Sequence, residues 1–124
     1  MNSFELKTHK LSRNKTIAVI CVGGCIDVFT SHTLEDELVS ALENKCYNII
    51  VDLSDVDYIS SMGWSIMLNH LSKVRHFNGD LKLANMNKDV YEVYKVLEFH
   101  WFLKSYKTLD AAISDFYESA YAVA

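Results

Sequence analysis

One short apolar strand that leads toward a pair of serines constrains the fold of this chain more than any other feature. Ile49, Ile50 and Val51 form a β-branched run that is too uniform for a half-exposed strand and too short for a helix. Such a run is typical of a central strand that is buried on both faces. Ser60 and Ser61 then precede a long segment with apolar residues at helical spacing. We therefore expect a buried strand, a turn and a helix that begins with an exposed hydroxyl group.

The link between this strand and the helix contains residues that favour a turn. Asp55 and Asp57 have side chains that commonly hydrogen-bond the backbone of turns, so we expect the strand to end before them. Ser60 is placed to be the helix N-cap, and Gly63 falls in the first helical turn, where another segment can approach the backbone closely. Ser60 and Ser61 are also consistent with a helix cap that has no further role.

Apolar periodicity divides the rest of the chain into alternating strands and helices. Two strands separated by the polar residues 12–15 predict an antiparallel hairpin, and Gly23-Gly24 is expected to end its second strand. Thr30 or Ser31 is expected to cap the first helix. The predicted strands are 4–10, 16–22, 48–53, 81–84 and a short one within 99–106, and the later helices are 61–77, 87–97 and 109–121.

Strands that alternate with helices require a largely parallel sheet with right-handed crossovers. Together with the opening hairpin, this pattern predicts an α/β fold with a mixed, largely parallel sheet of about four to five strands and about four helices. The chain has 124 residues and no linker or internal repeat, so residues 1–124 are expected to form a single domain. Asp27 and the Ser60-Ser61 pair should then meet at the edge where the parallel strands end.

Two blocks of the sequence carry a family resemblance. Residues 51–63 have the sequence VDLSDVDYISSMG, and residues 24–30 have the sequence GCIDVFT. In order and spacing, both blocks resemble the signature of the STAS domain, the family typified by bacterial anti-sigma factor antagonists. A weaker similarity near residues 96–99 and 109–113 extends the resemblance over roughly residues 4 to 116. The resemblance implies a STAS-like fold for the single domain 1–124.

The resemblance also implies a function in protein binding. In the similar proteins, the surface shared by the two blocks carries a phosphorylated serine and binds a serine kinase that doubles as an anti-sigma factor. Ser61 matches the phosphoacceptor and Asp27 matches the acidic residue beside it. A cognate phosphatase would reverse the modification. The implied partner-binding residues are Asp27, Val28, Phe29, Thr30, Ser60, Ser61, Met62 and Gly63.

Some residues of these blocks depart from the family pattern. Ser60 stands where the best-known members have Asp, and Met62 replaces a small residue. Trp64-Ser65 replaces a typical Leu-Gly pair, which enlarges the rim of the site and bears on the choice of partner. Trp64 also shares an apolar helix stripe with Met67, which favours a place in the core over a role as a partner anchor.

Two functional hypotheses follow from the resemblance. In the first, a kinase modifies Ser61 and the added charge, close to Asp27, Asp55 and Asp57, releases the partner. In the second, the chain is a non-switching STAS subunit of a stressosome-like or transporter-associated complex. Without the resemblance, Asp27 could equally end a strand and begin a turn, and residues 28–29 could form a docking patch or a hydrophobic staple.

Composition limits the partners and the location. The net charge of −4 and the lack of a basic patch argue against nucleic-acid binding. The densest basic group, in residues 7–15, flanks the predicted hairpin turn and is expected to be solubilising edge charge. The sequence has no apolar run of about 18 residues and no signal-peptide pattern, so we expect no membrane insertion and a cytoplasmic location. Nothing in the sequence indicates the oligomeric state.

The cysteines and histidines do not form a recognisable catalytic or metal site. Three cysteines are an odd number, which favours a reducing compartment over a disulfide framework. Cys21 and Cys25 could form half of a metal site, but no second ligand pair follows, so structural roles are favoured for these cysteines and for Cys46. Five histidines occur without a nucleophile elbow or a phosphate-binding loop. We expect no enzymatic activity, no metal and no cofactor.

Overall fold

The computed structural model describes residues 3–122, with side chains up to residue 118. One sheet contains five strands in the order β1-β2-β3-β4-β5. The first pair is antiparallel and the later pairs are parallel, which confirms the predicted α/β class with an opening hairpin. The strands are β1 Glu5–Ser12, β2 Thr16–Ile26, β3 Asn48–Ile59, β4 Asp80–Ala84 and β5 Ser105–Tyr106. The helices are α1 Thr30–Glu43, α2 Ser61–His76, α3 Lys88–Val96 and α4 Leu109–Ala122, with a 3-10 turn η1 at Phe99–Trp101.

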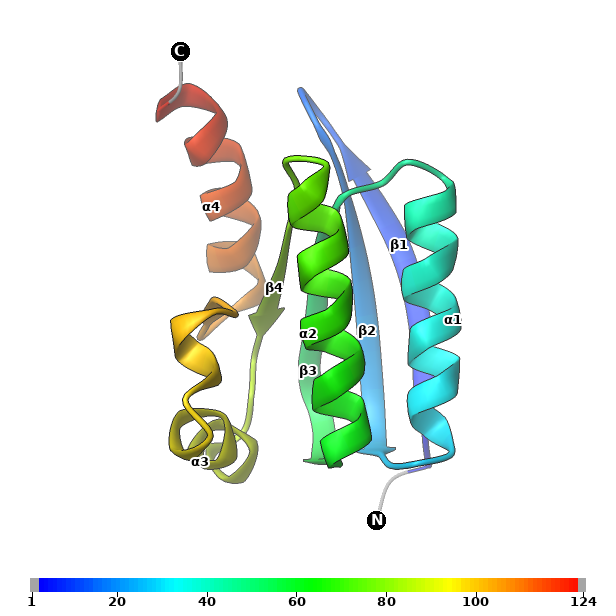
Figure 1. Cartoon of the computed structure of the whole chain (residues 1–124). Coiled ribbons are helices and arrows are strands. Elements are labelled where there is room, and N and C mark those ends of the chain that lie inside the picture. Colours follow the sequence, from blue (N-terminus) through cyan, green and yellow to red (C-terminus); the bar gives the residue numbers. More distant parts are fainter. Residues whose placement is uncertain (1–2, 123–124) are drawn as a thin grey trace.

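The helices cover the two faces of the sheet unequally. Helices α1 and α2 lie side by side on one face (Figure 1), and α4 packs on the other face. Ile49 and Val51 belong to the apolar cluster beneath α1 and α2, whereas Ile50 belongs to the cluster beneath α4. All three side chains have zero exposure, which confirms the predicted central strand buried on both faces.

Strand β2 extends further than its sequence predicted. The expectation that Gly23-Gly24 would end it is wrong, because the strand continues to Ile26. The register between β2 and β3 shifts on both sides of this pair, as in a β-bulge, and Gly24 has a φ of 87°. Glycine tolerates that backbone conformation without steric cost, so the strand is bent there without being interrupted. The extension carries Asp27 to the end of the sheet.

Strand β3 also extends further than expected. Asp55 and Asp57 were assigned to a turn, but they lie within the strand, which continues to Ile59. Pairing with β4 ends at Asp52, so the rest of β3 pairs with β2 alone and can present exposed carboxylates. The alternation of exposed aspartates with the buried Val56 outweighs the turn preference of aspartate in this segment.

Helix α4 is attached to the sheet through a buried charge. The side chain of Lys82, on β4, is 3% exposed, and its Nζ lies 2.6 Å from Oδ2 of Asp115 on α4. The hydroxyl of Tyr106 donates to the same carboxylate, and Lys82 lies over the ring of Phe116. Burial lowers the pKa of Lys82, whereas the hydrogen bond from Lys82 lowers the pKa of Asp115. A buried ammonium requires such a partner, so this pair sets the position of α4.

Helix α2 contributes a buried histidine to the interface with α1. His70 is 4% exposed, and among the described residues its Nε2 has no hydrogen-bond partner. Burial, with a smaller contribution from Lys73, lowers the pKa of His70 from 6.5 to about 4. The ring is therefore neutral in the folded protein at neutral pH.

We expect this histidine to make the protein less stable in mild acid. Below pH 6.5 the unfolded chain binds a proton that folded His70 takes up only near pH 4, so the free energy of unfolding falls across this window. The loss should be on the order of 3 kcal/mol at most. Urea unfolding between pH 7 and 4 should show a smaller pH dependence for His70→Met than for the wild type. The exposed control His76→Gln should keep the wild-type dependence, and equal profiles for His70→Met and wild type would contradict the assignment.

Candidate functional site

A backbone hydrogen bond joins the two turns that the sequence placed at one edge of the sheet. The amide of Ser60, after β3, donates to the carbonyl oxygen of Ile26, at the end of β2, over 2.7 Å. Gly63 completes the contact, because a Cβ at this position would lie 2.8 Å from Cγ2 of Ile26 and 2.9 Å from Cγ2 of Ile59. The structure therefore brings Asp27 and the Ser60-Ser61 turn together, and only glycine permits this approach.

The two serines at the start of α2 have different roles. Ser60 is the N-cap, as predicted: it is 8% exposed, and its Oγ accepts a hydrogen bond from the amide of Gly63 over 3.2 Å. Ser61 is exposed, and its hydroxyl makes no hydrogen bond within the described part of the chain. Because Ser60 supplies the cap, the hydroxyl of Ser61 is not needed for helix formation and is accessible to another molecule.

Asp27 organises the other turn. Its Oδ1 accepts hydrogen bonds from the amides of Phe29 and Thr30, each over 2.9 Å. The Thr30 hydroxyl accepts from the Asp27 amide and donates to the carbonyl oxygen of Cys25. The hydrogen bonds that the carboxylate accepts, from the Thr30 amide above all and also from the Thr30 hydroxyl and the Phe29 amide, lower the pKa of Asp27, so it is charged at neutral pH.

The expectation that Thr30 or Ser31 caps α1 through its side chain is wrong. The N-cap position is Phe29, which makes no side-chain cap, and the Asp27 carboxylate binds the free amides instead. Ser31 is completely buried and its hydroxyl donates to the carbonyl oxygen of Val28. Asp27 lies only two and three residues before these amides, so its side chain bonds them within a local turn.

Exposed apolar side chains surround the two turns. Val28 is 56% exposed and Phe29 83%, so they do not form a hydrophobic staple and are available as a docking patch. Met62 and Tyr58 are also exposed, whereas Trp64 is 2% exposed and lies in the core, as its stripe predicted. Tyr58 was missed because its segment was assigned to a turn. In the observed strand, Tyr58 lies two residues before Ser60, beside the candidate site.

The part of the chain that the structure describes contains neither a candidate metal centre nor a candidate membrane span. Among residues 3–122, no cluster of three His, Cys, Asp or Glu side chains is arranged to hold a metal ion. Cys46 is buried, and Cys21 and Cys25 are half-buried free thiols. No helix in this part of the chain is both long enough and apolar enough to span a membrane. The arrangement at the two turns is suited to binding a protein surface.

Residues 9–112 match the family model of the STAS domain. The chain belongs to the STAS family. BtrV of Bordetella bronchiseptica, a protein assigned as an anti-sigma factor antagonist, is 28% identical over 92 residues, which cover 73% of this chain and 79% of that protein. The sequence resemblance carried by residues 24–30 and 51–63 is therefore confirmed.

Solved structures confirm the fold at lower sequence identity. A Thermotoga maritima protein assigned as an anti-sigma factor antagonist has a TM-score of 0.78 at 18% identity, over 87% of this chain and 92% of its own. The anti-sigma factor antagonist SpoIIAA of Bacillus matches in two forms. The unphosphorylated form has a TM-score of 0.69 at 15% identity, over 94% of this chain and 98% of its own. The phosphorylated form has a TM-score of 0.67 at 16% identity, over 92% and 99%.

We expect Gly63→Ala to destabilise the protein by about 1–3 kcal/mol, because the added methyl group would overlap two β-branched side chains at the ends of β2 and β3. Urea unfolding measures this difference. Ser65→Ala, an exposed change in the first turns of the same helix, is the control and should stay within about 0.5 kcal/mol of wild type. Equal stability of Gly63→Ala and Ser65→Ala would show that α2 can move away from Ile26 at no cost.

Proposed function

We propose that this protein is a phosphorylation-regulated binding module that acts as an anti-sigma factor antagonist. In its unphosphorylated form it binds an anti-sigma factor that is also a serine kinase. The observation that carries the proposal is the division of roles at the start of α2, where Ser60 caps the helix and Ser61 presents an exposed hydroxyl beside Asp27. The module itself is not an enzyme, because the kinase and a cognate phosphatase perform the chemistry.

The surface around Ser61 has the composition of a protein-binding site. Val28, Phe29 and Met62 supply exposed apolar area, and Asp27 supplies a fixed negative charge among them. Apolar area favours association, and a charge at the centre of such an area selects a partner with a matching cation. Thr30, Ser60 and Gly63 would contribute to binding indirectly, because they hold the two turns in the position that the partner contacts.

Phosphorylation of Ser61 would oppose this binding. A phosphoserine adds a charge of about −1.5 to −2 at neutral pH. In the free protein, the amides at the start of α2 stabilise that charge, so the domain stays folded. In the complex, the same charge would be buried close to the ionised Asp27, and two like charges without a matched cation favour dissociation.

The relatives support the proposal. BtrV is assigned as an anti-sigma factor antagonist, and SpoIIAA, which has the same fold, has been solved in both phosphorylated and unphosphorylated forms. The STAS match covers residues 9–112, and we propose that the whole chain, residues 1–124, is one domain. The first two and last two residues lie outside the described residues.

We expect Ser61→Ala to fold normally and to bind the partner, but not to be phosphorylated. Since Ser60 retains the cap, its free energy of unfolding should stay within about 0.5 kcal/mol of wild type. Ser61→Asp should be unchanged in stability or gain roughly 0.3–1 kcal/mol from the helix dipole, yet bind the partner more weakly. Thermal melting, partner affinity and incubation with an anti-sigma-type serine kinase and ATP test all three points.

Ser72→Asp is the matched control, because it adds the same charge to an exposed position of the same helix, further from the site. It should bind the partner like wild type. If Ser61→Asp also binds like wild type, or if the kinase modifies another residue, the switch at Ser61 is wrong and a constitutively docked STAS subunit takes its place.

We expect Asp27→Asn to separate the effect of the Asp27 charge on kinase recognition from the structural role of its side chain. An asparagine oxygen can still accept the hydrogen bonds from the amides of Phe29 and Thr30, so the melting temperature should change little. Recognition by the kinase should weaken because the negative charge is lost. Asp110→Asn, an exposed change in the first turn of α4, is the control for net charge. If the kinase recognises Asp27→Asn as well as it recognises the wild type, then Asp27 serves only to cap α1.

A further inference from the structure

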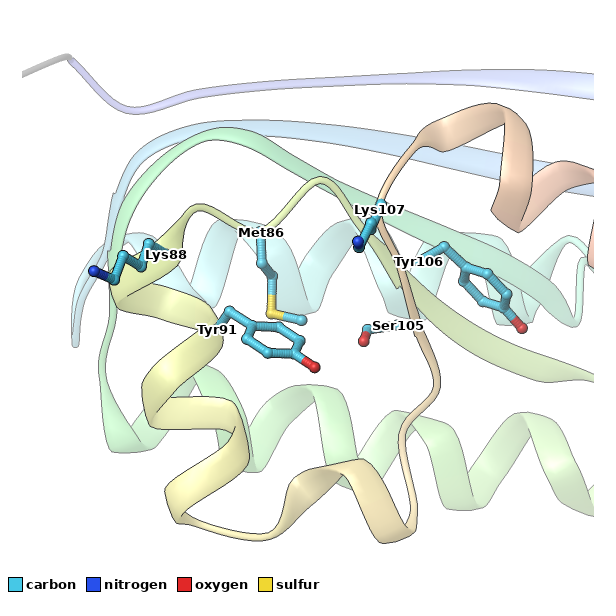
Figure 2. Close-up of a pocket in the computed structure, with 6 residues that line it drawn as sticks. All are labelled: Met86, Lys88, Tyr91, Ser105, Tyr106 and Lys107. Atoms are coloured by element: carbon cyan, nitrogen blue, oxygen red, sulfur yellow. The ribbon is translucent and has the colours of Figure 1, made fainter.

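A second candidate binding site lies at the same edge of the sheet, between α3 and the last two strands. A cavity of about 400 Å³ is formed where β4 and β5 end and α3 begins (Figure 2). Its volume is in the range of small-molecule sites, and the carboxyl ends of parallel strands are where open α/β sheets bind ligands. The lining residues are Met86, Lys88, Tyr91, Ser105, Tyr106 and Lys107.

Four of these side chains face a common space. Figure 2 shows the thioether of Met86 and the ring of Tyr91 on one side, with the hydroxyls of Tyr91 and Ser105 directed toward each other and the ammonium group of Lys107 nearby. The ammonium group of Lys88 points away. The cavity therefore combines a flat apolar wall with a polar end that contains one cation and two hydroxyl groups.

The ring of Tyr106 also points away from this space. Its hydroxyl donates to Asp115 on α4, so the side chain is held outside and contributes only to the edge of the cavity. The opening between Met86, Tyr91 and Lys107 is therefore not filled by the one large side chain that could reach it from β5.

The charge of the cavity differs from that of the protein. The chain has a net charge of −4, yet the lining residues include two lysines and no carboxylate. Among the described residues, the ammonium group of Lys107 forms no ion pair. An unpaired cation beside an aromatic ring and two hydroxyl donors favours a ligand with a negative charge at one end and a flat apolar body.

We propose that this cavity binds a small aromatic anion, with its ring against Tyr91 and Met86 and its carboxylate or phosphate on Lys107 and Ser105. The site is independent of the proposed partner switch, since none of its lining residues belongs to the turns around Asp27 and Ser61. Carboxylates and phosphates share the required chemistry, and the experiment below distinguishes them.

The test is an NMR titration of the full chain, labelled with ¹⁵N, with benzoate and separately with phenyl phosphate. Benzamide is the uncharged control ligand. We expect saturable shifts of the amide signals of Tyr91, Ser105 and Lys107, with a Kd on the order of 1 mM for probes of this size. The tighter of the two anions identifies the charged group, and benzamide should bind at least about fivefold more weakly.

Matched variants test the role of the cation. Lys107→Gln should weaken binding of the anions by about fivefold or more without changing the affinity for benzamide. Lys95→Gln removes the same charge from an exposed position on α3 outside the cavity and should bind like wild type. The proposal is overturned if the shifts do not saturate or map elsewhere, if benzamide binds as tightly as the anions, or if Lys107→Gln and Lys95→Gln behave alike.

Discussion

The parallel pairing of β2 with β3 is the constraint on which the rest of this structure depends. Both strands extend beyond the point where β4 stops pairing, and the pairing ends in the hydrogen bond from the Ser60 amide to the Ile26 carbonyl oxygen. Gly63 allows α2 to start directly against that junction. Two turns separated by more than thirty residues of sequence thus become one surface at the edge where the parallel strands end.

Within that surface, structural and exposed groups are kept separate. Ser60 and Thr30 use their hydroxyls to stabilise the turns, whereas Ser61 and the apolar side chains of Val28 and Phe29 remain free. Asp27 does both, since its carboxylate caps α1 and still carries its charge at the surface. A site built in this way needs little rearrangement to meet a partner, which reduces the entropy lost on binding.

Several sequence-based predictions failed for one common reason. Gly23-Gly24 and the aspartates at 55 and 57 have strong turn preferences, and each was expected to end a strand. Both segments instead continue as strands, because β2 and β3 pair with each other and a glycine at a positive φ accommodates the bulge. Thr30 failed as a cap for a separate, local reason, since the Asp27 carboxylate, three residues earlier, binds the free amides instead. Local preference is overruled when a neighbouring strand supplies the hydrogen bonds.

The sequence by itself determined the alternation of strands and helices, the central position of Ile49–Val51 and the cap at Ser60. Each of these follows from apolar periodicity or from a side chain that bonds its own backbone. The tertiary structure alone decided where β2 and β3 end, that Tyr58 borders the site, and that Lys82 is buried against Asp115. These features depend on groups that are distant in sequence, and no local pattern encodes which distant partner will satisfy a strand edge or a buried charge.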